Sequence, residues 1–501
     1  MSVLGIDIGT TGCKALVVDE DGHPLAFSRR EYPLQSPECG WAELDSAGVM
    51  NACFEVIAEA AGAVGGDHVE AIGMSTQGEA FTPVDADGEV LANAMVSSDT
   101  RADEFLHECV AEFGAERLYR ITGHTPHPMF TLFKLLWTKH RRPEVWNKAA
   151  LFLCFEDLLC MRLGLPPSMG WPLAGRTMLF DVNSREWSQS ILAMLDLDPT
   201  RLATPLASGS VVGELADPMC RRLGVRHGCL VVSGGHDQTC TGLGAGAIGH
   251  GVAVYGTGTV ECITPAMRRA IFSEKLMENN LCMYQHAAPG MYATVAFSLT
   301  GGNLLQWFRD EFGQLEMMKA RREGTDPYSL LLQQVPQAPA RPMVLPYFTP
   351  SGTPHFDLQT AGAVVGLRLS TTRGEFLKAL LEGVSFEMRL NLELLNDAGI
   401  GINELRAVGG AAVSQSLMQL KADVLNRPIR AVGNTEAGCF GAAMLARAAR
   451  GDASVADVAA RWVQLGVLLE PETDRARHYE DRFQEYRTLY CSMRAIDAGK
   501  E

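Results

Sequence analysis

Val3-Leu-Gly-Ile-Asp-Ile-Gly-Thr-Thr-Gly-Cys-Lys-Ala15 is the segment around which the rest of the chain can be organised. It predicts an apolar strand over residues 3–8, a tight turn over residues 9–12 and a second apolar strand over residues 15–18. Glycines permit such a turn because they adopt backbone angles that other residues avoid. We therefore expect the chain to begin with a strand, a turn and a strand.

The turn carries groups that suit a phosphate. Its glycines, Gly12 among them, let backbone N–H groups approach a ligand, and Thr10 and Thr11 add hydroxyl donors. Lys14 adds a cation just beyond the turn, and Asp7 on the first strand is placed to hold a divalent metal through water, as magnesium prefers. The segment indicates a cradle for a metal–phosphate group, and an ordinary glycine-rich β-hairpin explains it equally well.

Length and charge limit the class of protein. With 501 residues the chain is too long for one hydrophobic core, so we expect two domains or more. Hydrophobic residues make up 47% and charged residues 20%, as is usual for a globular protein. The net charge of −16 repels phosphate backbones, so nucleic acid is not expected as a partner and small anions must be held by local donors.

We expect a cytoplasmic protein. The N-terminus shows no basic leader followed by an apolar stretch, and no apolar run is long enough to cross a bilayer, so no membrane partner is expected. The 13 cysteines form no CxxC pair, and we interpret them as buried free thiols. The sequence leaves the oligomeric state open, with a homodimer as one option.

The opening pattern returns in the second half of the chain. Residues 251–255 predict an apolar strand, Gly256 and Thr257 open a glycine/hydroxyl turn, and residues 260–263 predict a second strand. A related stretch at residues 406–411 ends in two glycines. With 50 glycines, chance recurrence is the alternative, but each turn follows an apolar strand, which favours a duplicated phosphate-binding unit.

Further elements follow from apolar periodicity. Helical spacing predicts helices over residues 46–63, 103–113, 130–140 and 416–425. Residues 81–84 and 90–91 predict a hairpin. A strand over residues 230–233 ends in Gly234-Gly-His-Asp-Gln238 and continues as a helix of small residues.

A match to the dinucleotide fingerprint, at Gly244, Gly246 and Gly249, is discounted. Such a fingerprint follows a strand and opens a helix, whereas this one closes a helix and enters a strand. We interpret it as the junction between two similar domains, residues 1–246 and 247–501, that grip one nucleotide. An NAD-dependent enzyme is therefore disfavoured, and no Walker A motif occurs in the chain.

Eight motifs spread over nearly the whole chain point to one family. They are Gly5-Ile-Asp-Ile-Gly-Thr-Thr11, Ser98-Asp-Thr-Arg101, Lys134-Leu-Leu-Trp137, Gly234-Gly-His-Asp-Gln238, Gly256-Thr-Gly258, Gly301-Gly-Asn-Leu-Leu-Gln-Trp307, Gly362-Ala-Val-Val-Gly-Leu367 and Gly409-Gly-Ala411. With these motifs in the family's order, the chain resembles the FGGY carbohydrate kinases. The resemblance implies an α/β fold of two ribonuclease H-like domains, of the actin/hexokinase ATPase type, with a nucleotide and sugar cleft between them.

The resemblance implies transfer of the γ-phosphoryl group of Mg-ATP to a hydroxyl of a small sugar or polyol. Asp237 matches the family's catalytic base, and a carboxylate can accept the proton that the hydroxyl loses. Its place between a strand and a helix also favours the ionised form. A plain helix N-cap is the alternative role.

The resemblance also implies which residues bind the nucleotide and its metal ion. Asp7 would hold magnesium through water, and the two glycine–threonine turns would contact the phosphates of ATP. The expected ATP-binding residues are Thr10, Thr11, Gly12, Lys14, Gly256, Thr257, Gly302, Gln306, Gly410 and Ser414. Taken alone, Gln306 and Ser414 would be a surface helix residue and a capping residue.

The expected sugar-binding residues mix the features of two subfamilies; they are Gln77, Gly78, Glu79, Asp237 and Gln238. Many xylulose kinases carry Met-His after the glutamine, and glycerol kinases carry Arg-Glu. Glu79 matches the glycerol type, while Gly78 replaces the arginine. The pair of Asp237 and Gln238 also fits the glycerol type. A solvated charge at a strand end is the alternative role for Glu79.

Two further positions indicate a substrate larger than glycerol. Ser97 and Met129 stand where aromatic residues line the glycerol pocket. Loss of these rings and of the arginine at Gly78 is expected to widen the pocket and remove its hydrocarbon wall. The sequence therefore favours a ketopentose such as xylulose, with a kinase of a glycerol- or erythritol-like polyol, or of another sugar, as the alternative.

Other polar motifs are not assigned to chemistry. Asp99 and Arg101 fit an internal salt bridge at least as well as a substrate contact. His236 is interpreted as a satisfied neighbour of the base, and His124 and His127 lack further ligands for a metal site. An alternative from another class of protein is an actin-type ATPase that serves as a binding module. The motif around Asp237 argues against this alternative.

Overall fold

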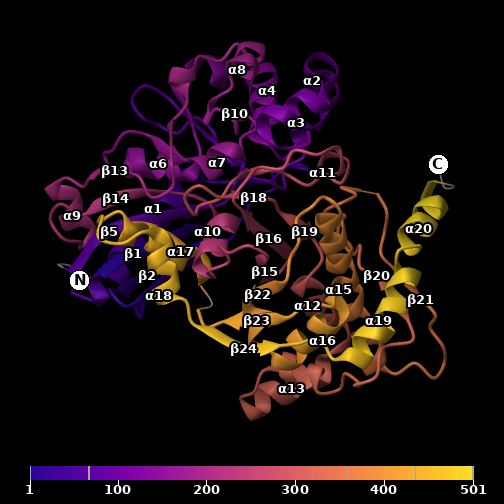
Figure 1. Cartoon of the computed structure of the whole chain (residues 1–501). Helices are drawn as coiled ribbons and strands as arrows, with labels where there is room; N and C mark the ends of the chain where they lie inside the picture. The colour runs from indigo at the N-terminus through magenta and orange to yellow at the C-terminus, as the bar shows by residue number, and fades with distance from the viewer. Residues whose placement is uncertain (1, 66–67, 358, 435, 499–501) are drawn as a thin grey trace.

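Two β-sheets with helices packed around them form the protein in the computed structural model, which describes residues 2–65, 68–357, 359–434 and 436–498 (Figure 1). Strands of the N-terminal half, in indigo and magenta, make one sheet, and strands of the C-terminal half make the other. Helices and strands are interspersed along the chain, so the fold is mixed α/β.

The first sheet has the strand order β13-β14-β5-β1-β2-β3. Its strands are β1 (Ser2–Ile8), β2 (Gly12–Asp19), β3 (Pro24–Glu31), β5 (Val69–Thr76), β13 (Val211–Glu214) and β14 (Leu230–His236). β1 runs antiparallel to β2, while β1, β5 and β14 are parallel neighbours. Their carboxyl ends therefore meet at one edge of the sheet, where the expected phosphate turn, the expected sugar loop and Asp237 follow them.

The second sheet begins with the same unit. Its order is β17-β18-β16-β15-β22-β23-β24, with β19 paired to β16. Its strands are β15 (Val252–Thr257), β16 (Glu261–Met267), β17 (Tyr284–Gln285), β18 (Tyr292–Ala293), β19 (Ala296–Ser298), β22 (Glu404–Val408), β23 (Ile429–Val432) and β24 (Leu465–Leu469). β15 is antiparallel to β16 and parallel to β22, as β1 is to β2 and β5. The expected recurrence of strand, turn and strand is thus confirmed.

Helices and short strands fill the connections. The helices are α1 (Ser46–Ala63), α2 (Leu106–Phe113), α3 (Ala115–Thr122), α4 (Thr131–Arg141), α5 (Pro143–Lys148), α6 (Phe155–Arg162), α7 (Trp171–Gly175), α8 (Gln189–Leu195), α9 (Asp217–Leu223), α10 (Asp237–Gly244), α11 (Glu274–Glu278), α12 (Gly302–Phe312), α13 (Gln314–Glu323), α14 (Pro327–Leu332), α15 (Arg373–Asp397), α16 (Gln415–Leu425), α17 (Ala437–Ala448), α18 (Val455–Trp462), α19 (Thr473–Tyr486) and α20 (Leu489–Ala498). The short strands are β4 (Glu43–Leu44), β6 (Thr82–Val84), β7 (Ala94–Met95), β8 (Leu151–Leu153), β9 (Ser168–Gly170), β10 (Phe180–Asp181), β11 (Glu186–Trp187), β12 (Thr204–Leu206), β20 (Met343–Leu345) and β21 (Ala363–Val365).

Helices α10 and α17 meet backbone to backbone. A Cβ on Gly244 of α10 would lie 1.9 Å from the carbonyl oxygen of Ala437. A Cβ on Gly441 of α17 would lie 2.0 Å from the carbonyl oxygen of Cys240. Each helix therefore needs a residue without a side chain where it touches the other. The contact joins the helix that carries Asp237 to a helix from the C-terminal half.

The same helix α17 lies on the first sheet, where Figure 1 shows it in yellow over indigo strands. A Cβ on Gly5 of β1 would lie 1.8 Å from the carbonyl oxygen of Cys439, and one on Gly73 of β5 would lie 2.0 Å from that of Ala442. The C-terminal half thus contributes a helix to the core of the N-terminal sheet. The boundary expected at residue 246 remains a prediction.

Most predicted elements are confirmed, and three differ in detail. The helix expected over residues 103–113 is divided, because residues 101–105 form a 3₁₀ helix and α2 begins at Leu106. The strand before Asp237 continues through the glycines to His236, because Gly234 fits where a Cβ would lie 1.4 Å from the carbonyl oxygen of Met74. Residues 81–84 and 90–91 share only one bridge, Val84 with Val90, since β6 pairs instead with β8. The glycine fingerprint begins at the end of α10 and precedes β15. This confirms that it does not follow a strand and open a helix, as a dinucleotide-binding fingerprint does.

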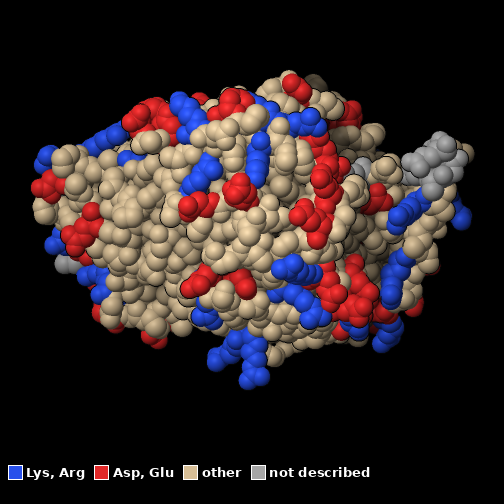
Figure 2. Space-filling model, turned by 90° about the horizontal axis from the view of Figure 1, so that it is seen from above, with Lys and Arg blue, Asp and Glu red and all other residues tan. Residues whose placement is uncertain are grey.

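The surface carries charges of both signs. On the face shown in Figure 2, basic side chains stand among acidic ones, whereas a nucleic-acid-binding face gathers basic ones. Among the described residues, no helix combines the length and apolar character that crossing a membrane requires.

We expect Gly441→Ala to destabilise the protein by about 2 kcal/mol or more, because the new methyl group forces α10 and α17 apart. The loss should appear although alanine favours a helix over glycine by about 1 kcal/mol. Gly62→Ala in α1 is the matched control, since no atom lies within 4 Å of its Cβ position. Thermal unfolding midpoints of both variants test the contact, and equal midpoints would contradict it.

Candidate active site

A cavity of about 340 Å³ lies where the carboxyl ends of β1, β5 and β14 meet. All five expected sugar-binding residues line it, together with Thr10 of the first phosphate turn. These residues come from three separate segments of the sequence, and the parallel order of the strands brings them together. The cavity is therefore the candidate sugar site.

Asp237 is the first residue of α10, and His236 occupies the N-cap position. The alternative role of Asp237 as an N-cap is therefore wrong. Its side chain is 28% exposed and lines the cavity, and its Oδ1 atom has no hydrogen-bond partner among the described residues. Burial, helped by the nearby carboxylates of Asp7 and Glu79, raises the pKa of Asp237 to about 7. A carboxyl group with this pKa can take up and release a proton near neutral pH.

His236 is held in its neutral form beside Asp237. Its Nδ1 lies 2.8 Å from the hydroxyl of Tyr284, and its Nε2 lies 3.2 Å from Oδ1 of Asp237. Burial lowers the pKa of His236 well below its usual value, and the nearby charge of Arg176 lowers it further. A neutral, hydrogen-bonded imidazole agrees with its interpretation as a satisfied neighbour.

Position 78 is a glycine and supplies no arginine, but another arginine, Arg176, reaches the sugar site from a different segment. Arg176 caps the C-terminus of α7, and its Nε donates a 2.5 Å hydrogen bond to the carboxylate of Glu79. The guanidinium lies 5.1 Å from the centre of the Phe130 ring. The two partners are 97 residues apart in sequence, so only the fold reveals the pair. Glu79 is paired with a cation rather than solvated.

The backbone of Glu79 is strained and firmly held. Its φ of 66° lies in the left-handed region, which a non-glycine residue seldom adopts. Its carbonyl oxygen accepts hydrogen bonds from Lys134 Nζ at 3.1 Å and from Thr131 Oγ1 at 3.0 Å. Lys134 is fully buried and also donates to the carbonyl oxygen of Met95. The lysine of the expected Lys134-Leu-Leu-Trp137 motif therefore fixes the turn that presents Glu79.

The cavity has an aromatic wall, so the expectation that its hydrocarbon wall is missing is wrong. Ser97 and Met129 do line the cavity, but three phenylalanines line it with them, one directly after Met129 and two from the C-terminal half. These are Phe130, Phe297 and Phe356. The sequence analysis considered only residues of the N-terminal half for this wall, so it could not predict the two phenylalanines that the C-terminal half supplies.

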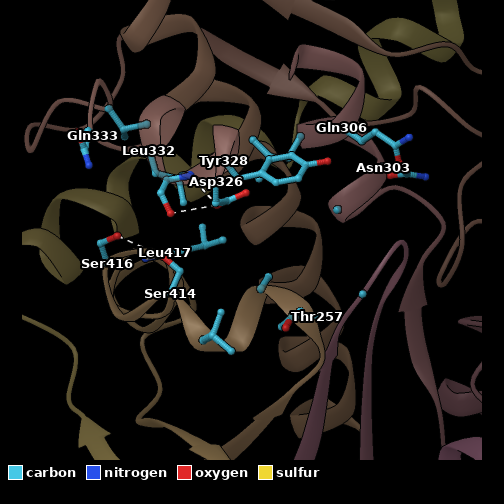
Figure 3. A pocket seen from close by; sticks show the side chains of 18 of the residues that line it. Thr257, Asn303, Gln306, Asp326, Tyr328, Leu332, Gln333, Ser414, Ser416 and Leu417 are labelled. Carbon is cyan, nitrogen blue, oxygen red and sulfur yellow. Dashed lines mark hydrogen bonds between the residues drawn. The ribbon is translucent and has the colours of Figure 1, made fainter. Parts of the chain in front are cut away.

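A second cavity, of about 1020 Å³, lies beside the second sheet (Figure 3). The expected ATP-binding residues of this half line it, apart from Gly256: Thr257, Gly302, Gln306, Gly410 and Ser414. Tyr328 from α14 and Leu417 from α16 approach it from opposite sides, and Asn303 from α12 lies next to it. The sequence analysis missed these three residues. Asn303 lies inside a family motif but was given no role, and Tyr328 and Leu417 lie outside every motif. The cavity is large enough for a nucleotide.

The β15–β16 turn separates the two cavities. Thr257 lines the larger one, while Val260 and Cys262 line the smaller one. The Thr257 hydroxyl donates to the carbonyl oxygen of Val408 at 2.8 Å, so this turn offers a ligand its backbone N–H groups. Gly256 packs under the turn, where a Cβ would lie 2.9 Å from the sulfur of Cys262.

The remaining residues of the first phosphate turn lie outside both cavities. The Lys14 ammonium is 2.7 Å from the carboxylate of Glu436, just before α17. Thr11 is exposed, and Gly12 packs against the backbone of Arg30. Their assignment to the phosphates of ATP stays a prediction.

Asp7 offers a carboxylate that fits a bound cation. It accepts a 2.6 Å hydrogen bond from Ser75 Oγ, and no described residue forms an ion pair with it. Burial raises its pKa, which a divalent cation would reverse. No three described His, Cys, Asp or Glu residues are grouped to hold a metal, so a magnesium ion here would take its other ligands from water and phosphate.

Asp99 and Arg101 form the internal salt bridge that was one of their two expected roles. Arg101 Nε donates to the Asp99 carboxylate at 2.9 Å, and the Arg101 guanidinium lies 3.6 Å from the centre of the Trp41 ring. Neither residue lines the sugar cavity.

Known proteins similar to this chain match it over most of its length. Residues 2–244 match the FGGY family of carbohydrate kinases, N-terminal domain, and residues 251–450 match the C-terminal domain of that family. A xylulose kinase from Bacillus subtilis is 26% identical over 500 residues, covering 99% of this chain and 98% of the relative. A glycerol kinase from Methylibium petroleiphilum is 28% identical, covering 92% and 93%. The crystal structure of a xyloylose kinase from Brucella ovis has a TM-score of 0.88 at 27% identity, covering 99% and 100%.

The raised pKa of Asp237 predicts a pH-dependent difference in stability between the wild type and Asp237→Asn. The folded protein keeps its proton up to a pKa of about 7, whereas the unfolded chain loses it near pH 4. Wild-type stability should therefore fall relative to the variant by about 1–2 kcal/mol between about pH 5 and 8, reduced by partial exposure. Urea unfolding of the ligand-free proteins measures this, and a difference independent of pH would contradict it.

Proposed function

The chain belongs to the FGGY family of carbohydrate kinases, and we propose that it transfers the γ-phosphoryl group of ATP to a hydroxyl of a ketopentose such as xylulose. One observation carries this proposal. The sugar-site cavity and the nucleotide-sized cavity are lined by neighbouring residues of the β15–β16 turn, and Asp237 lines the sugar-site cavity. A phosphoryl group passed across the turn would meet a hydroxyl held by Asp237.

In this proposal Asp237 is the general base. Its carboxylate accepts the proton of the attacking hydroxyl as the bond to the γ-phosphorus forms, and ADP leaves. A pKa of about 7 keeps a large fraction ionised at neutral pH while leaving the group basic enough to take the proton. Glu79, held by Arg176 and Lys134, accepts hydrogen bonds from other hydroxyls, and Gln77 and Gln238 add amide groups to the same wall.

ATP and Mg²⁺ are the proposed cofactors. The nucleoside lies in the larger cavity against Gln306, Gly410 and Ser414. Asp7 is the residue that would hold the magnesium ion through water. The ion, when bound with ATP, neutralises negative charge on the phosphates.

Charge favours a neutral sugar over an acid sugar. Among the described residues that line the sugar cavity, Arg176 is the only one that carries a positive charge, and Glu79 already pairs with it. Burial lowers the pKa of His124 and of His236 well below the usual value, so neither adds a charge. A sugar carboxylate would therefore enter beside Asp237 without a free cation.

A polyol kinase is the second candidate. The pair of Glu79 and Arg176, together with Gln238, keeps the polar groups of the glycerol-type site, and glycerol kinases are among the relatives. Against glycerol itself, a cavity of about 340 Å³ leaves a three-carbon substrate poorly enclosed. An actin-type ATPase module would need neither the sugar cavity nor Asp237.

A substrate panel tests the substrate class. We expect the specificity constant for ketopentoses to exceed those for glycerol and gluconate by about tenfold or more, because one missing carbon or one unpaired charge costs at least that much. ADP release with ketopentoses, tetritols, glycerol and gluconate measures it. A higher constant for glycerol would favour the polyol kinase, and turnover indifferent to every sugar would favour the ATPase module.

Asp237→Asn should lower kcat by about 10²–10⁴-fold, because asparagine cannot accept the proton. Its affinity for ATP should stay within about threefold of the wild type, since Asp237 lies outside the nucleotide cavity. Asp21→Asn, on an exposed turn, is the control for the same chemical change elsewhere. Steady-state rates and nucleotide titration measure both effects. Wild-type turnover by Asp237→Asn would remove Asp237 from the mechanism.

A further inference from the structure

Phe356 reaches the sugar cavity from the C-terminal half of the chain, outside every motif that the sequence analysis used. It lines the cavity opposite residues of the N-terminal half. Its ring centre lies 5.0 Å from that of His127 and 5.7 Å from that of Phe297. The ring is therefore part of the cavity wall and packs against one aromatic ring from each half of the chain.

The backbone at Phe356 is strained. Its φ is 48°, in the left-handed region, where a bulky residue costs about 1–3 kcal/mol. Such a conformation persists only where neighbouring contacts hold it. Two backbone contacts do so locally: the Phe356 N–H donates to the carbonyl oxygen of Gly352 at 2.9 Å, and the Ser351 N–H donates to that of Asp357 at 2.9 Å.

The loop is also fastened from outside. Asn280, another residue of the cavity wall, donates from Nδ2 to the carbonyl oxygen of Pro354 at 2.7 Å. On the opposite side, Tyr490 of α20 stacks on the His355 ring, with centres 3.6 Å apart and planes at 14°. The Tyr490 hydroxyl donates to the carboxylate of Asp357 at 3.0 Å. The residues before and after Phe356 are thus both held by one tyrosine.

Helix α20 lies beyond residue 450, where the match to the family ends. Its Leu489, Tyr490 and Met493 pack on the core of the C-terminal half, so the helix is a fixed support for the loop. This gives the last segment of the chain a connection to the sugar site that its sequence did not indicate.

We infer that Phe356 is a specificity-determining residue that limits the length of the sugar, and that Tyr490 is a positioning residue that holds it in place. The inference rests on the proposed function and deepens it. The flat ring covers the carbon face of a five-carbon sugar and occupies the space that a sixth carbon would need. Removing the ring opens that space and weakens the grip on the shorter sugar.

Phe356→Ala tests the first part. The specificity constant for a ketopentose should fall about tenfold, mostly through KM, while the ratio of ketohexose to ketopentose constants should rise about tenfold or more. The KM for ATP should change less than about twofold, because Phe356 does not line the nucleotide cavity. Phe27→Ala, an exposed phenylalanine on β3, is the matched control and should change neither value. Phe356→Leu, with a smaller side chain, should shift the ratio in the same direction and serves if the alanine variant fails to fold.

Two variants of Tyr490 test the second part. Tyr490→Ala should shift the ratio in the same direction as Phe356→Ala, by about threefold or more, while Tyr490→Phe, which keeps the stack on His355, should recover most of it. A lower melting temperature of Tyr490→Ala without a change in the ratio would reduce α20 to a structural role and overturn this part.

The outcomes separate this inference from the proposed function. If the wild type phosphorylates ketopentoses and Phe356→Ala leaves the ratio unchanged, the inference is wrong and the proposed function stands. If the wild type phosphorylates no ketose, the proposed function is wrong. The ratio is then taken between its best substrate and the homologue one carbon longer, and an unchanged ratio overturns the inference as well.

Discussion

The contact between α10 and α17 is the constraint on which the site depends. Gly244 and Gly441 let the two helix backbones touch, and Gly5 lets α17 lie directly on β1. Asp237 opens α10, and the Lys14–Glu436 ion pair lies at the start of α17. Any side chain in this contact would separate the helices, and with them the proposed base and the first phosphate turn. The position of Asp237 relative to the first turn thus depends on glycines, which have no side chain.

The site gathers negative charge and balances only part of it. Of the three carboxylates Asp7, Glu79 and Asp237, only Glu79 forms an ion pair with a lysine or arginine among the described residues. Burial raises the pKa of the other two, and the nearby carboxylate of Asp7 raises that of Asp237 further. Under the proposed function, this arrangement would disfavour anionic sugars, keep Asp237 basic enough to accept a proton and leave Asp7 able to hold a cation. The proposed substrate class, the proposed base and the proposed metal therefore all depend on one electrostatic condition.

Sequence patterns predicted the elements and loops that depend on residues close together in the chain. Alternation and glycine turns predicted the strand–turn–strand units, and the family motifs predicted that Asp237 and the Gln77–Glu79 loop share one cavity and that the expected ATP-binding residues of the C-terminal half share another. They could not predict Arg176, which lies 97 residues from its partner Glu79, or Phe356, which crosses from the other half of the chain. Such contacts depend on tertiary packing. The pairing of β6 with β8 was missed for the same reason.

The most direct test of the account is a crystal structure of the protein with a ketopentose and a non-hydrolysable ATP analogue. The account predicts one sugar hydroxyl within hydrogen-bond distance of the Asp237 carboxylate and in line with the terminal phosphate, which lies at the turn that holds Gly256 and Thr257. A sugar bound with no hydroxyl at Asp237, or a nucleotide outside the cavity lined by Gly410 and Ser414, would contradict it.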